Sequence, residues 1–78
     1  SGTISGVTDW GIYVEEQSVH AEGMVKLRDL KDDFYVLDAP NYRLVGQRKK
    51  KVYKLGDKVR VKLLAIDPLR RTLDFVFV

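Results

Sequence analysis

The stretch Lys58-Val59-Arg60-Val61-Lys62-Leu63 has the clearest alternation of apolar and basic side chains in the sequence. Successive side chains of a β-strand point to opposite faces, so the pattern predicts a strand with Val59, Val61 and Leu63 inward and three basic residues outward. Other β-prone segments, separated by turn residues, predict further strands. We expect these over residues 2–7, 10–15, 22–28, 34–38, 42–46 and 71–78.

This order of segments predicts an all-β fold, a small antiparallel barrel of five strands whose closure removes exposed sheet edges. The segments 34–38 and 42–46 read as an extra hairpin with its turn at Pro40-Asn41, inserted between the third and fourth barrel strands. Residues 17–21 are expected to form a polar loop. The charged connector 29–33 can hold one turn of helix.

Length and composition limit the class of protein. A chain of 78 residues is a single domain with a compact core. The absence of cysteine excludes a disulfide framework and a thiolate metal site, and His20 has no second histidine with which to bind a metal. These residues contain no long uncharged apolar run and no leader peptide, so we expect an aqueous, reducing, cytoplasmic location. The ends of the chain indicate a domain excised from a larger protein.

Charge is unevenly distributed along the chain. Residues 1–40 contain three basic and eight acidic residues, whereas residues 41–78 contain eleven basic and three acidic ones. Such a separation predicts a basic face for a polyanionic partner, unless the barrel interleaves the two halves. The block Arg48-Lys49-Lys50-Lys51 is a secondary basic patch that either guides RNA or forms a solvent-exposed turn.

The segment Trp10-Gly11-Ile12-Tyr13 places two large aromatic residues beside a glycine. Rings on an open barrel face can stack on unpaired bases, so the segment indicates single-stranded nucleic acid as the partner. The alternative is that one of the rings belongs to the core. Residues three positions apart face opposite sides of a regular strand, so a shared face predicts a bulge or strong twist near Gly11.

Several segments together resemble the S1-type RNA-binding domain, a five-stranded OB-fold barrel. They are residues 2–14, Glu22-Gly23-Met24-Val25, residues 55–62, and Ile66-Asp67 with Arg71. Residues 30–35, the hairpin through 42–46 and residues 52–57 resemble the insertion in the C-terminal S1 domain of the bacterial ribonuclease R and ribonuclease II exoribonuclease family. Ribonuclease R is the closer of the two.

The resemblance implies an RNA site. The resemblance places Trp10 and Tyr13 on the RNA face. It also places Lys26 at a position where the family commonly has a histidine. An ammonium group there can pair with phosphate, but it cannot stack as a ring does. Basic residues on the fourth strand can follow the RNA backbone, although solvated surface or turn roles remain open for the charged members. The candidate RNA-binding residues are Trp10, Tyr13, Lys26, Arg60, Lys62, Asp67 and Arg71.

No catalytic site is expected in this chain. Metal-dependent phosphodiester hydrolysis needs converging carboxylates, whereas the acids here lie singly or as neighbours such as Glu15-Glu16 and Asp32-Asp33. The resemblance implies that a separate domain of a 3′-to-5′ exoribonuclease cuts the RNA with a divalent metal such as Mg²⁺. This domain, a monomer without a cofactor of its own, would hold single-stranded RNA beside the other domains of the parent.

Two alternatives stay open at this point. The chain can be an S1 module of another RNA-handling protein, such as a ribosomal or transcription-associated factor. It can also be a basic barrel that docks an acidic protein.

Overall fold

The computed structural model describes residues 1–18 and 20–78; Val19, in the loop expected over 17–21, lies outside the described residues. The all-β class is confirmed. The strands are β1 (Gly2–Val7), β2 (Gly11–Glu16), β3 (Ala21–Lys26), β4 (Tyr35–Asp38), β5 (Arg43–Gly46), β6 (Val52–Lys54), β7 (Lys58–Val59), β8 (Val61–Asp67) and β9 (Thr72–Phe77). Two short 3₁₀ helices, η1 (Leu27–Asp29) and η2 (Ala39–Asn41), connect them.

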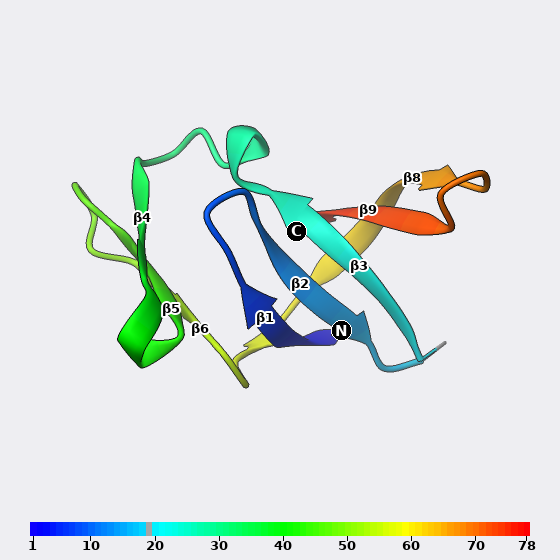
Figure 1. Ribbon diagram of the computed structural model, residues 1–78, viewed down its shortest axis with the longest axis horizontal. Helices are drawn as coiled ribbons and strands as arrows, with labels where there is room; N and C mark the ends of the chain where they lie inside the picture. Colours follow the sequence, from blue (N-terminus) through cyan, green and yellow to red (C-terminus); the bar gives the residue numbers. More distant parts are fainter. Residues whose placement is uncertain (19) are drawn as a thin grey trace.

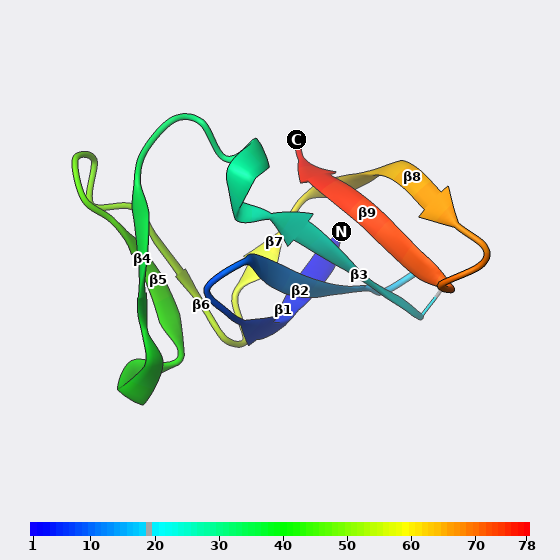
Figure 2. The same ribbon diagram turned by 45° about the horizontal axis from the view of Figure 1, so that its top comes forward.

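The strands form two sheets (Figure 1). The larger sheet has the order β7-β1-β2-β3-β9-β8, with β3 and β9 parallel and its other neighbours antiparallel. Its edge strands β7 and β8 are consecutive pieces of one segment, interrupted at Arg60, so the sheet curls on itself (Figure 2). The sheet is therefore curled like a barrel, and the predicted fourth barrel strand supplies both of its edges.

The inward side of that fourth strand packs against the core at two of its three predicted positions. Val59 and Val61 pack against the core as expected. Leu63 pairs with the buried Phe75 and therefore lies on the predicted inward face, but 49% of its surface is exposed, because β8 is an edge strand with only β9 as a partner. Leu63 is therefore directed inward without being a core residue.

The inserted region is more extensive than a hairpin. β4 and β5 pair in the predicted range, with η2 at their turn, and β6 adds a third strand beside β5 that the sequence analysis did not predict. This insertion sheet stands beside the curled sheet (Figure 1). The helical turn η1 begins at Leu27, because β3 ends at Lys26 rather than at residue 28.

One core joins the two sheets. The Tyr53 ring lies parallel to the Phe77 ring of β9, with centroids 4.8 Å apart and an interplanar angle of 5°. Tyr35 contacts Tyr53 at 5.4 Å in a tilted arrangement. The insertion sheet therefore packs as part of the same hydrophobic unit as the curled sheet. The buried core residues are Ile4, Ile12, Val14, Val25, Tyr35, Leu44, Tyr53 and Phe75.

β3 and β9 approach each other closely at Gly23. A Cβ atom built on Gly23 would lie 2.6 Å from Cε2 of Phe75 and 2.8 Å from the carbonyl oxygen of Leu73. Because one of these atoms is backbone, the strands would have to separate to admit a side chain. Glycine at this position therefore permits the parallel pairing of β3 with β9.

We expect Gly23→Ala to destabilise the domain by about 1–3 kcal/mol, the usual cost of overpacking a tight core. Chemical unfolding in urea measures the change. Gly6→Ala is the matched control, since its new Cβ would meet Tyr13 only at an ordinary contact distance of 3.5 Å. Equal stability of the two variants would contradict the close approach at Gly23.

Asp33 anchors the connection between β5 and β6. Its carboxylate accepts hydrogen bonds from the backbone N–H groups of Phe34 (2.6 Å), Arg48 (3.0 Å) and Lys49 (2.8 Å). Desolvation by itself raises the pKa of Asp33, but the backbone donors outweigh it and hold the pKa below its ordinary value of 3.8. The ionised carboxylate therefore supports the folded loop.

Because the pKa of Asp33 is lowered on folding, its contribution to stability is present above pH 3.8 and is lost as the pH falls through the folded-state value. We expect Asp33→Asn to lower the urea midpoint at pH 7 and to flatten the decline of that midpoint as the pH falls below 3.8. Part of the decline remains in this variant, because the pKa of Asp38 is also lowered. A pH dependence identical to that of the unmodified chain would contradict the role of Asp33.

Candidate nucleic-acid interface

Trp10 lies in the turn between β1 and β2, and 60% of its surface is exposed. The Thr8 hydroxyl accepts hydrogen bonds from the backbone N–H groups of Trp10 (3.3 Å) and Gly11 (3.0 Å) and donates one to the Gly11 carbonyl oxygen (2.8 Å). The Trp10 carbonyl oxygen accepts a hydrogen bond from the Leu27 N–H at 3.0 Å. A fixed backbone thus presents an open indole ring, and Trp10 is not a core residue.

Tyr13 points to the outer face of β2, between the fully buried Ile12 and Val14, and is half-buried. Trp10 precedes β2, so the turn itself brings both rings to the outside. The irregularity expected near Gly11 is absent from β2 in the described register and lies instead in β1, between Ile4 and Gly6. The bulge therefore lies in the partner strand, opposite Tyr13 and Val14, and not at Gly11.

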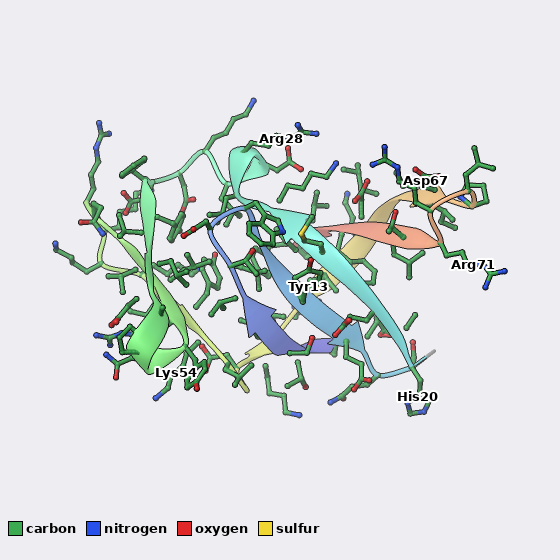
Figure 3. The ribbon with its side chains drawn as sticks, viewed as in Figure 1. Tyr13, His20, Arg28, Lys54, Asp67 and Arg71 are labelled. Atoms are coloured by element: carbon green, nitrogen blue, oxygen red, sulfur yellow. The ribbon has the colours of Figure 1, made fainter. Side chains whose placement is uncertain are left out.

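A groove of about 360 Å³ runs along the outer face of β2, β3 and β9 and is called here the Tyr13 groove. Figure 3 shows Tyr13 near the middle of the curled sheet, with Asp67 and Arg71 at the turn between β8 and β9. Four of the predicted residues are thus brought to one groove. Its lining includes Tyr13, Met24, Lys26, Asp67, Arg71 and Asp74.

A second groove of about 520 Å³, the Trp10 groove, adjoins the first. The two share Met24, Lys26 and Arg70 in their linings, while Trp10 lines only the second. Three side chains common to both linings make the two grooves one connected surface. Trp10 and Tyr13, the two predicted aromatic residues, therefore line adjoining grooves of the same connected surface.

Charge differs between the two grooves. The Trp10 groove has three cations, Lys26, Arg28 and Arg70, against the single acid Asp9. The Tyr13 groove has three cations against three acids, and two of these acids form ion pairs. Lys26 Nζ lies 3.7 Å from Asp74 Oδ2, so part of the Lys26 charge is already compensated.

Asp67 is a turn residue as well as part of the groove lining. Its Oδ1 accepts hydrogen bonds from the backbone N–H groups of Leu69 (3.1 Å) and Arg70 (3.2 Å). Its Oδ2 lies 3.8 Å from Nε of Arg70, and within residues 1–18 and 20–78 it forms no ion pair with Arg71. The ion pair therefore involves Arg70 and not Arg71. Arg71 is exposed, at a backbone φ of 55°.

Arg60 and Lys62 are exposed as predicted, but they line neither of these grooves. Arg60 lines a third groove with Lys51 and Lys58. Lys62 lies on β8 opposite Val76. The rest of the basic block, residues 48–50, forms the exposed loop anchored by Asp33.

Met24 and Arg70, which line both grooves, are among the residues that sequence analysis missed. Met24 alternates with the buried Val25, so the period of the strand already indicated its outward position. Arg70 follows Asp67 by three residues in a Pro-containing turn, a spacing at which an aspartate commonly binds the backbone ahead of it. Both signals were present in the sequence.

Within the described part of the chain, no group of histidine and acidic side chains is arranged to hold a metal ion. No helix formed by these residues has the length and apolar character needed to cross a membrane.

A family model described as S1 RNA binding domain matches residues 1–76. Ribonuclease R of Aquifex aeolicus is 46% identical over 95% of this chain, and ribonuclease R of Ureaplasma parvum is 39% identical over 99%. The chain spans about a tenth of the length of each of these curated relatives. The expected resemblance to ribonuclease R is confirmed.

Two solved structures of Mycoplasma genitalium RNase R match the fold, one in the apo form and one in complex with ribose methylated single-stranded RNA. Each gives a TM-score of 0.91 at 30% identity, over 99% of this chain and 12% of the other. Sequence and fold therefore agree over nearly every residue, and the chain belongs to the S1 RNA-binding domain family.

Proposed function

We propose that this domain holds single-stranded RNA for a 3′-to-5′ exoribonuclease of the ribonuclease R type and does so with little sequence preference. The observation that carries the proposal is the exposed Trp10 ring on a hydrogen-bonded turn, beside a connected surface that also contains Tyr13 and Lys26. Every base has a π-face, so stacking on fixed rings binds RNA irrespective of sequence.

Each residue of the surface has a distinct role in this proposal. Trp10 and Tyr13 stack on bases, and Lys26 and Arg71 neutralise phosphates together with Arg70. Asp67 acts indirectly, because its hydrogen bonds shape the turn that presents the two arginines. No member of this set performs bond cleavage.

The comparisons support the proposed parent protein. The matching relatives are ribonuclease R enzymes about ten times longer than this chain, and one similar structure contains single-stranded RNA. We propose that residues 1–78 form one domain of such a cytoplasmic enzyme and that its catalytic domain uses a divalent metal such as Mg²⁺. The isolated domain would be a monomer that contacts other domains in the parent.

Binding by the isolated domain should be weak. Stacking is worth about 1–3 kcal/mol per base, and two rings must offset the cost of ordering a flexible strand. The Tyr13 groove adds little net attraction for phosphate, because its three cations face three acids. The domain therefore contributes only part of the RNA affinity of a larger enzyme.

We expect Trp10→Ala to weaken binding of a short unstructured oligoribonucleotide by about 5- to 150-fold, the loss of one stacked base. Fluorescence anisotropy of a labelled oligonucleotide measures this without the tryptophan signal. Tyr42→Ala is the matched control, because Tyr42 is equally exposed, at 63% against 60%, and lines none of the three grooves.

Equal losses in the two variants, or none in either, would refute the stacking role of Trp10. In the unmodified domain, saturable quenching of Trp10 fluorescence that weakens with salt should accompany binding. Binding of an acidic protein at the same surface, with no RNA bound at low salt, would favour the docking alternative.

We expect Asp74→Asn to tighten RNA binding severalfold, because it removes one acid from the Tyr13 groove and frees the Lys26 ammonium for phosphate. The slope of log affinity against log salt should steepen by about 0.7, the value for one added contact to a single strand. Affinities at four salt concentrations measure the slope. Asp29→Asn removes an equal charge outside the three grooves, and a matching gain there would show that net charge alone is responsible.

A further inference from the structure

A third groove, here called the Arg60 groove, lies where the insertion sheet meets the curled sheet. It has a volume of about 390 Å³. Its cations come from three places in the fold, Lys51 before β6, Lys58 in β7, and Arg60 between β7 and β8. All three lie within residues 51–60, and the fold places them around one groove.

The charge of this groove is largely uncompensated. Within residues 1–18 and 20–78, no ion pair joins Lys51, Lys58 or Arg60 to an acid. Asp57 is the single acid in the lining, and its carboxylate accepts a hydrogen bond from the Lys54 N–H at 2.9 Å. Three cations against one acid is the same balance as in the Trp10 groove.

The aromatic residues of this groove are not free to stack on bases. Tyr53 is 7% exposed, with its ring against Phe77, and Lys51 Nζ lies 5.1 Å from the centroid of the Tyr53 ring. The groove thus offers charge without an open ring. Such a surface suits the phosphodiester backbone, which is charged at every nucleotide, and it gives no base discrimination.

The outer face of the curled sheet connects this groove with the Tyr13 groove. Lys62 of β8 is paired with Val76 of β9, so both side chains point outward. Two residues earlier on β9, Asp74 pairs with Met24 of β3, which lines the Tyr13 groove. Arg60, two residues before Lys62, lines the third groove, so the path crosses only β9 and β8.

We propose that the Arg60 groove is a second RNA contact that binds the phosphate backbone of a strand whose bases stack at Trp10 and Tyr13, with Lys62 between the two sites. This inference rests on the proposed function. It separates the roles of the residues, because the aromatic surface holds bases and the Arg60 groove holds only phosphates. An RNA long enough to cross β9 gains the second contact, and a shorter one does not.

The test compares oligoribonucleotides of about 4 and about 12 nucleotides, two lengths within the range of OB-fold site sizes. The variant combines Lys51→Ala, Lys58→Ala and Arg60→Ala. We expect the long RNA to bind the variant more weakly, with a salt slope shallower by about 2, corresponding to three lost phosphate contacts. Affinity for the short RNA and its quenching of Trp10 should not change.

The matched control combines Lys31→Ala, Arg43→Ala and Lys54→Ala, which removes the same charge outside the groove and preserves the Lys54 N–H group bound by Asp57. Arg60→Gln alone is a second test for the case in which the triple variant does not fold. It removes one of the three cations and should produce about a third of the change in salt slope. Urea midpoints confirm that each variant is folded.

The outcomes separate the two proposals. The proposed RNA contact at the Arg60 groove is overturned if the salt slope for long RNA is unchanged in the triple variant, or if the control variant loses as much affinity. Quenching of Trp10 fluorescence in that case still supports the proposed function. Groove-dependent binding of long RNA without quenching of Trp10 overturns the stacking proposal and supports phosphate binding at the groove. Absence of RNA binding by the unmodified chain at low salt overturns both.

Discussion

The stack of Tyr53 on Phe77 is the contact on which the arrangement of this domain depends. Small domains bury a limited share of their surface, so a three-stranded insertion has to share a core with the main sheet to be stable. The two rings provide that shared core, and Tyr35 extends it to β4. The same rings form part of the Arg60 groove, so one packing contact both fixes the insertion and positions the cations around it.

Rigid backbone and open side chains occur together at the interface. The Thr8 hydrogen bonds fix the turn before β2, and Asp67 fixes the turn after β8. Such turns present Trp10 and Arg71 without burying them. Less conformational entropy is lost on binding when the backbone is already ordered, which favours binding even by a small surface.

Alternation along single strands was readable from the sequence. The inward positions of Val59, Val61 and Phe75 and the outward position of Lys26 follow from a period of two, which is a local property of extended backbone. The exposure of Leu63 could not be predicted in this way. It depends on the lack of a second neighbour for β8, which is a property of the strand order in the sheet and not of the local sequence.

The sequence by itself determined the all-β class, the aromatic pair Trp10 and Tyr13, and the family, because each depends on local pattern and residue order. The tertiary structure alone decided which charges act together. Lys26 meets Asp74 across parallel strands, whereas Lys51 and Arg60 meet in a separate groove. Pairing of distant strands brings Lys26 to Asp74, and the electrostatic field depends on distance in space, so the net charge of a sequence segment does not reveal which charges act together.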